Sequence, residues 1–144
     1  MPNDTTADRP SWRVLIAEDD EEFRKVLARS LRQHGFAVTE CRHGVDLIGQ
    51  LRCLVESADA NDFDLIISDI RMPGVTGLSV LAGLREFKNA PPIILITAFG
   101  DDETHAEAMH LGAAAMIDKP FEIAELLAKA DEILAAPSAG RRDK

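Results

Sequence analysis

The chain has 144 residues, 46% of them hydrophobic, and its formal net charge is −9. This length suits one compact domain and is too short for two of ordinary size. The negative charge argues against direct binding of nucleic acid, because neutralising phosphates takes basic side chains. No apolar run approaches the roughly 20 residues of a membrane span, and the polar N-terminus lacks the apolar segment of a secretory signal. We therefore expect a cytoplasmic domain over residues 12–136, between a disordered tail at 1–11 and a polar tail at 137–144.

The cysteines and histidines do not predict a metal site. Cys41 and Cys53 have no metal-ligand spacing and do not make a disulfide framework, so we expect both to be reduced and partly buried. The histidines are expected at the surface or at helix caps: His34, His43, His105 and His110.

Hydrophobic patterning predicts five strands, each followed by a helix. The predicted strands are residues 12–17, 36–41, 63–68, 93–96 and 114–117. Apolar residues at helical spacing mark the helices: Phe23, Val26, Leu27 and Leu31 in the first; Leu47, Ile48, Leu51, Leu54 and Val55 in the second; Leu78, Leu81, Leu84 and Phe87 in the third; Ala106, Met109 and Leu111 in the fourth; Leu126, Leu127, Ala130, Ile133 and Leu134 in the fifth. The fourth helix has the weakest apolar face.

This alternation of strand and helix predicts one fold class. Parallel strands joined by right-handed helical crossovers form a sheet with helices on both faces. Five such units indicate a flavodoxin-like, doubly wound (βα)5 fold, with a five-stranded parallel sheet in the order 2-1-3-4-5. Ligands of such folds bind at the carboxyl ends of the strands, here near strands 1 and 3.

Polar residues stand at those carboxyl ends. Glu18 and Asp19 follow strand 1, and Asp69 follows strand 3. Three neighbouring carboxylates repel one another, and a hard divalent cation such as Mg²⁺ would relieve that repulsion. Each residue alone has an ordinary structural explanation. Asp20, for example, is an acid of the kind that the first turn of a helix favours. The grouping at one edge of the sheet is what indicates a site.

The remaining strand ends carry a hydroxyl and a lysine. Thr97 follows strand 4 and Lys119 follows strand 5. A lysine ammonium, a hydroxyl donor and a Mg²⁺ site together stabilise phosphoryl charge, and phosphoryl transfer needs little beyond positioning and charge neutralisation. A carboxylate among them can act as the nucleophile and form an aspartyl-phosphate.

Four motifs in order now identify a family resemblance. They are Val14-Leu-Ile-Ala-Glu-Asp-Asp20, Asp64-Leu-Ile-Ile-Ser-Asp-Ile-Arg-Met-Pro-Gly74 with Gly77, Ile94-Leu-Ile-Thr-Ala98, and Asp118-Lys-Pro-Phe121. Over about residues 12–136 the chain resembles bacterial two-component response-regulator receiver domains of the single-domain, chemotaxis-regulator kind.

The resemblance implies roles for individual residues. Asp69 would be the phosphoacceptor. Asp19 and Asp69 would bind Mg²⁺ directly, Glu18 through water, and Arg71 through its backbone carbonyl. Thr97 would be the switch hydroxyl, and Lys119 would pair with the phosphoryl group. The Lys119-Pro120 peptide bond is often cis in this family. Asp20 lies one place beyond the acidic pair and is left out of the core site.

It also implies how the domain would work. A sensor histidine kinase, a phosphotransfer protein or a small acyl phosphate would be the donor. The domain would catalyse its own phosphorylation and slow dephosphorylation, which makes it a switch and not a turnover enzyme, with no organic cofactor. The phosphorylated state would favour an output protein, or a homodimer, on the face of the fourth helix, fifth strand and fifth helix. No membrane partner is expected.

One position departs from the family pattern, and it leaves an alternative open. Receivers usually carry Tyr or Phe in strand 5 as the switch partner of the threonine, and here Met116 holds that place. The alternative is a pseudo-receiver, an interaction module that works without phosphorylation. A flavin-binding protein is disfavoured because Glu18 and Asp19 would repel a phosphate. A phosphohydrolase of the haloacid-dehalogenase type would need an acid where Arg71 stands.

Overall fold

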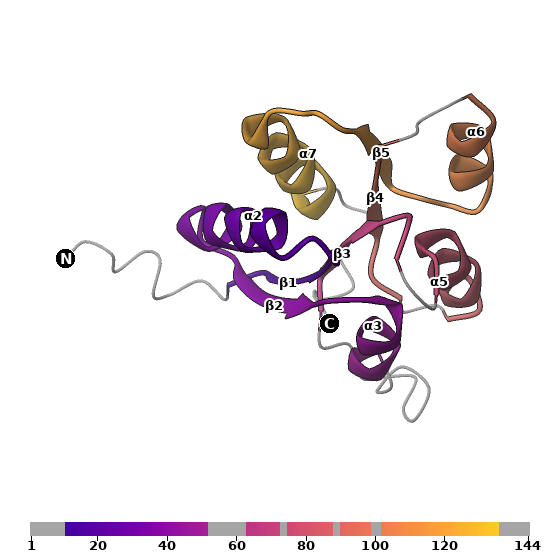
Figure 1. Ribbon diagram of the computed structural model, residues 1–144, viewed down its shortest axis with the longest axis horizontal. Helices are drawn as coiled ribbons and strands as arrows, with labels where there is room; N and C mark the ends of the chain where they lie inside the picture. Colours follow the sequence, from indigo (N-terminus) through magenta and orange to yellow (C-terminus); the bar gives the residue numbers. More distant parts are fainter. Residues whose placement is uncertain (1–10, 52–62, 73–74, 88–89, 99–101, 136–144) are drawn as a thin grey trace.

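The structure is a computed structural model that describes residues 11–51, 63–72, 75–87, 90–98 and 102–135. A five-stranded parallel sheet in the order β2-β1-β3-β4-β5 forms its centre, which confirms the predicted fold (Figure 1). The strands are β1 (Arg13–Ala17), β2 (Ala37–Cys41), β3 (Leu65–Asp69), β4 (Ile93–Thr97) and β5 (Ala115–Asp118). The helices are α2 (Glu21–Gln33), α3 (Gly44–Gln50), α5 (Gly77–Leu84), α6 (Asp102–His110) and α7 (Ile123–Ala135).

The helices form two layers, one on each face of the sheet (Figure 1). Helices α2 and α7 lie together on one face, where Leu27 and Leu126 pack with Ile67 of β3. Helices α3, α5 and α6 cover the other face, where Leu81 packs with Leu95 of β4. Strands β3 and β4 are buried along their whole length, which is why each reads as a continuous apolar run.

The strand register brings the carboxyl ends of neighbouring strands level with one another. Ala17 of β1 lies beside Ser68 of β3, and Asp69 lies beside Ile96 of β4. Thr97 at the end of β4 lies beside Asp118 at the end of β5. Residues just past these positions therefore meet at one edge of the sheet.

The predicted apolar face of the first helix is partly wrong. Val26 is 50% exposed, whereas the buried residues of α2 are Arg24, Leu27, Ala28 and Leu31. Ile48 on α3 and Met109 on α6, both predicted to face the core, are also exposed. These errors arise because apolar side chains occur on more than one stripe of a helix, and only packing against the sheet decides which stripe is buried.

The histidines occupy the positions that the sequence predicts, whereas Cys41 is more deeply buried than expected. His43 caps the N-terminus of α3, and the other three histidines lie at the surface, as expected. Cys41 is fully buried, and burial raises the pKa of its thiol to about 12. The described residues do not include Cys53, Leu54 or Val55. They include Ser11 but no other residue of the two predicted tails.

None of the helices in the described part of the chain has the length and hydrophobicity to cross a membrane.

Candidate functional site

Asp69 is the last residue of β3, and both oxygens of its buried carboxylate accept hydrogen bonds. Lys119 Nζ lies 2.9 Å from Oδ2, and the backbone N–H of Arg71 donates to Oδ1 at 2.9 Å. The residue as a whole is 7% exposed. The structure thus brings the predicted nucleophile and the predicted lysine into direct contact.

Glu18 directly follows β1 and is 2% exposed. Its Oε1 accepts from Lys119 Nζ at 3.4 Å, and its Oε2 accepts from the backbone N–H of Asp20 at 3.0 Å. Burial raises the pKa of Glu18 to about 7, and the hydrogen bond and charge of Asp69 add to the shift, against the opposing effects of Asp20 and Lys119. Two carboxylates, of Glu18 and Asp69, thus share the single ammonium of Lys119 at this edge of the sheet.

Lys119 is fixed by its surroundings as well as by the two carboxylates. Burial by itself would lower the pKa of Lys119, but the hydrogen bond to Asp69 and the charges of Asp69 and Glu18 raise it above its usual range. Its Nζ lies 4.8 Å from the centre of the Phe23 ring, close enough for a cation–π contact. Its backbone N–H donates to the carbonyl of Thr97 at 2.8 Å, and the Lys119-Pro120 peptide is cis.

Thr97 and Met116, the predicted switch pair, lie on neighbouring strands. Thr97 ends β4 and is 2% exposed. In the β4–β5 register, Met116 lies beside Leu95, which is two residues before Thr97. Leu95 and Met116 both pack into the core that α3, α5 and α6 cover. Because alternate residues of a strand face the same side, Thr97 shares the sheet face of Leu95 and Met116.

The predicted metal ligands are only partly gathered. Glu18 and Asp69 meet around Lys119, whereas Asp19 is exposed. Among the described residues, no three Asp, Glu, His or Cys side chains form a ready metal-binding group. The donor set nevertheless suits Mg²⁺, because it consists of carboxylate oxygens, and Glu18 and Asp69 share one ammonium.

Sequence reasoning missed two side chains next to this site. Phe23 covers Lys119, and its ring packs edge to face with Phe121 at 5.9 Å between centroids. Arg24, which is buried, donates from Nη1 to the backbone carbonyl of Glu18 at 3.0 Å. The signal was present, because Arg24 precedes Leu27, Ala28 and Leu31 by three, four and seven residues, which is the spacing of one helix face.

Asp20 and the acidic end of β5 have local roles. Asp20 caps the N-terminus of α2, where its Oδ1 accepts from the N–H of Phe23 at 3.2 Å. Asp118 pairs with His105 of α6 at 2.8 Å.

A doubly wound sheet with two acids and a lysine at its carboxyl edge defines a class of α/β proteins with a charged site at the switch point. The family model of the response regulator receiver domain matches residues 14–131, and the chain belongs to that family.

Curated relatives and solved structures agree with this assignment. The chain is 36% identical over 140 residues to the transcriptional activator protein PfeR of Pseudomonas aeruginosa, covering 93% of this chain and 43% of that protein. It is 39% identical over 121 residues to protein PetR of Rhodobacter capsulatus, covering 84% of this chain and 48% of PetR. The non-phosphorylated HemR receiver domain of Leptospira biflexa superimposes with a TM-score of 0.77 at 25% identity, over 88% of this chain and 96% of that one. The chain thus spans about half the length of the curated relatives it matches.

Proposed function

We propose that this receiver domain accepts a phosphoryl group on Asp69 in a Mg²⁺-dependent reaction and thereby switches the binding of a partner. The observation that carries the proposal is the contact of 2.9 Å between Lys119 Nζ and Asp69 Oδ2, beside the buried carboxylate of Glu18. A carboxylate that has a fixed ammonium at one oxygen, at the carboxyl edge of this fold, suits nucleophilic attack on phosphorus.

The chemistry of the chain follows from these contacts. An Asp69 oxygen forms a bond to phosphorus while the bond from phosphorus to the donor nitrogen or oxygen breaks, and that electron pair leaves with the donor. Lys119 is already protonated and placed beside the reacting carboxylate, so it neutralises charge without moving far. Thr97 follows Ile96, the residue of β4 that lies beside Asp69, so its hydroxyl would be a further donor to a phosphoryl oxygen.

Glu18, Asp19 and Asp69 would hold the Mg²⁺ ion, with the backbone carbonyl of Arg71. When bound, the ion supplies positive charge that screens these carboxylates and the phosphoryl oxygens from one another. The closeness of Glu18 and Asp69, which share the ammonium of Lys119, supports this assignment. Lys119 Nζ lies within reach of both Asp69 Oδ2 and Glu18 Oε1, so its positive charge is shared between the two acids.

The output face would consist of α6, β5 and α7. Helix α6 has one buried residue, Ala108, so little apolar packing opposes its displacement. The contact between His105 and Asp118 ties α6 to the residue before Lys119, and the amide of Lys119 is bonded to Thr97. A change at Thr97 or Lys119 therefore has a short route to α6.

The proposed partners are a sensor histidine kinase or phosphotransfer protein as donor and an output protein or second copy of the domain as acceptor of the signal. Several relatives are named as transcriptional regulators, and the chain spans about half of their length. If this chain serves such a regulator, DNA contact would come from another domain, because the net charge of −9 disfavours direct binding.

The test is intact-protein mass after incubation with acetyl phosphate, with Mg²⁺ or with EDTA. We expect the wild type to gain one phosphoryl group only with Mg²⁺, and Asp69→Asn to gain none. Asp20→Asn is the matched control, because asparagine also caps helices and Asp20 lies outside the core site. Wild type that gains no mass and binds no Mg²⁺ or beryllofluoride would instead support a phosphorylation-independent pseudo-receiver.

A further inference from the structure

Arg24 is a buried charged residue that the proposed chemistry leaves unused. It is 5% exposed and lies on the stripe of α2 that faces the sheet. Burying a guanidinium is costly unless it is paired and hydrogen-bonded. Its partners therefore show what this position does.

The guanidinium of Arg24 joins two elements. Nη1 donates to the backbone carbonyl of Glu18 at 3.0 Å, and Nε donates to Oε1 of Glu40 on β2 at 3.1 Å. The planar fork of arginine makes both bonds at once from a rigid group, which a lysine ammonium on a flexible stem does not reproduce.

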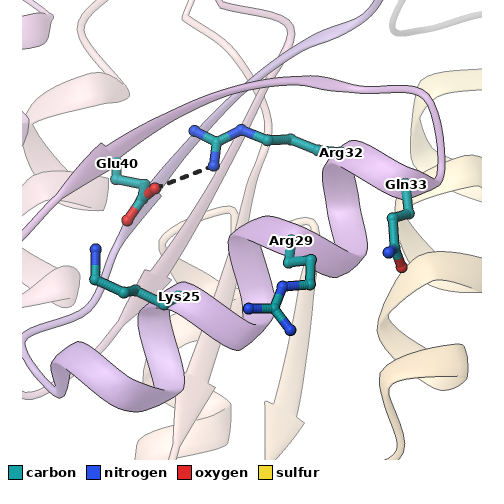
Figure 2. A pocket seen from close by; sticks show the side chains of 5 residues that line it. All are labelled: Lys25, Arg29, Arg32, Gln33 and Glu40. Atoms are coloured by element: carbon teal, nitrogen blue, oxygen red, sulfur yellow. Dashed lines mark hydrogen bonds and ion pairs between the residues drawn. The ribbon is translucent and has the colours of Figure 1, made fainter.

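Glu40 is in turn held by a second arginine. Arg32 Nη1 lies 3.2 Å from Glu40 Oε2, and Arg32 Nη2 donates to the carbonyl of Val38 at 3.0 Å. Burial by itself would raise the pKa of Glu40, but the hydrogen bonds from Arg24 and Arg32 outweigh it and hold the pKa below its usual range. Figure 2 shows Glu40 and Arg32 at an open groove that Lys25, Arg29 and Gln33 also line.

Glu18 is consequently fixed at four atoms. Its N–H donates to the carbonyl of Cys41 at 3.1 Å, and its carbonyl accepts from Arg24 at 3.0 Å. Its two carboxylate oxygens accept from Asp20 and Lys119. The carbonyl belongs to the peptide that joins Glu18 to Asp19, so the Arg24 bond fixes the plane of that peptide and the direction in which the Asp19 side chain leaves the backbone.

We infer that Arg24 is a positioning residue of the metal-binding loop, with Glu40 as its anchor on β2. The inference rests on the proposed function, since it concerns the same Mg²⁺ site. Groups that orient metal ligands typically change metal affinity by about 10- to 100-fold when removed. Loss of the Arg24 fork should therefore weaken Mg²⁺ binding, although Arg24 does not touch the ion.

The experiment measures Mg²⁺ affinity of the full chain from the backbone amide resonances of Glu18 and Asp19. We expect Arg24→Lys to weaken Mg²⁺ binding about 10-fold and to move the amide resonance of Asp19 in the metal-free protein. Glu40→Gln should weaken binding by a smaller factor, about threefold, because Arg24 remains but loses its charged anchor. The phosphorylation rate at subsaturating Mg²⁺ should fall in parallel and recover at saturating Mg²⁺.

Two control variants distinguish a loss of positioning by Arg24 from a general loss of stability or of positive charge. Arg32→Gln removes the other arginine from Glu40, and Arg29→Gln removes one positive charge from the same groove. Both should leave Mg²⁺ affinity within twofold of wild type. An Arg24→Lys protein that unfolds at the same urea concentration as wild type, with unchanged affinity and an unchanged Asp19 resonance, would overturn the inference.

If Arg24→Lys does not fold, Glu40→Gln decides the question by the same readouts, and unchanged affinity again overturns the inference. The proposed function fails separately, in wild type, if no Mg²⁺ binding or phosphorylation is seen. Wild type that binds Mg²⁺ and is phosphorylated, beside unaffected Arg24 and Glu40 variants, rejects only the role of Arg24.

Discussion

Lys119 Nζ lies 2.9 Å from Asp69 Oδ2 and 3.4 Å from Glu18 Oε1, although the three residues come from three different strand ends. One ammonium thus joins two buried carboxylates that would otherwise repel each other. This arrangement suits the proposed chemistry, and substitution can test the part that each residue has in it.

Lys119→Met should slow phosphorylation by acetyl phosphate at least about 100-fold, because it removes the fixed charge beside the reacting carboxylate. Intact-protein mass over time gives the rate. Lys129→Met is the matched control on α7, where Lys129 forms an exposed pair with Glu132. Equal rates in the wild type and in Lys119→Met would show that Lys119 has no part in the reaction.

Glu18→Gln should stabilise the metal-free protein at pH 7.5 by about 1–3 kcal/mol. The pKa of Glu18 is raised to about 7 by burial, so the folded state binds this proton more tightly than the unfolded state. Wild-type stability should therefore fall as the pH rises from 5 to 7, and this fall should be absent in Glu18→Gln. Urea unfolding in EDTA measures both effects, and a destabilised Glu18→Gln would contradict them.

Glu40→Gln should destabilise the protein at neutral pH by about 1–2 kcal/mol, because each of its oxygens accepts a hydrogen bond from an arginine. The pKa of Glu40 is held below its ordinary value, so its contribution is complete above about pH 5 and is lost as the pH falls through the folded-state pKa. When the free energy of unfolding is measured with urea between pH 3 and 7, it should depend less on pH in Glu40→Gln than in the wild type. A parallel pH profile in both proteins would exclude this role.

Gly77→Ala should lower the free energy of unfolding by about 1–3 kcal/mol and impair phosphorylation. A Cβ at this position would lie 2.8 Å from the backbone carbonyl oxygen of Asp69 and 3.1 Å from Cα of Ile70, and neither backbone atom can move freely. A Cβ added at Gly83, on the same helix, would meet nothing within 4 Å. Gly83→Ala should therefore raise the free energy of unfolding by about 1 kcal/mol through helix propensity. Thermal unfolding and the acetyl phosphate assay compare the two, and equal effects would refute the steric argument.

Much of the architecture could be predicted because its causes are local. Strands β3 and β4 are buried on both faces and so appear as unbroken apolar runs. Alternation with helices then restricts the topology to parallel order with right-handed crossovers. The predicted site residues at the strand ends needed only the rule that ligands bind at the carboxyl edge.

The stripe of α2 that faces the sheet could not be predicted in the same way. Val26 and Leu27 are adjacent and both apolar, yet Val26 is 50% exposed and Leu27 is 1% exposed. The angle at which a helix meets a sheet depends on all the side chains between them, and here it buries Arg24 in place of Val26.

The sequence alone determined the fold class, the order of the strands and the set of charged residues at the carboxyl edge, because burial and topology leave a regular pattern along the chain. The tertiary structure decided how those charges pair: Lys119 between Asp69 and Glu18, and Arg24 between Glu18 and Glu40. Such pairing depends on distances of a few ångströms between residues far apart in the chain, and only the packing of helices on the sheet sets those distances.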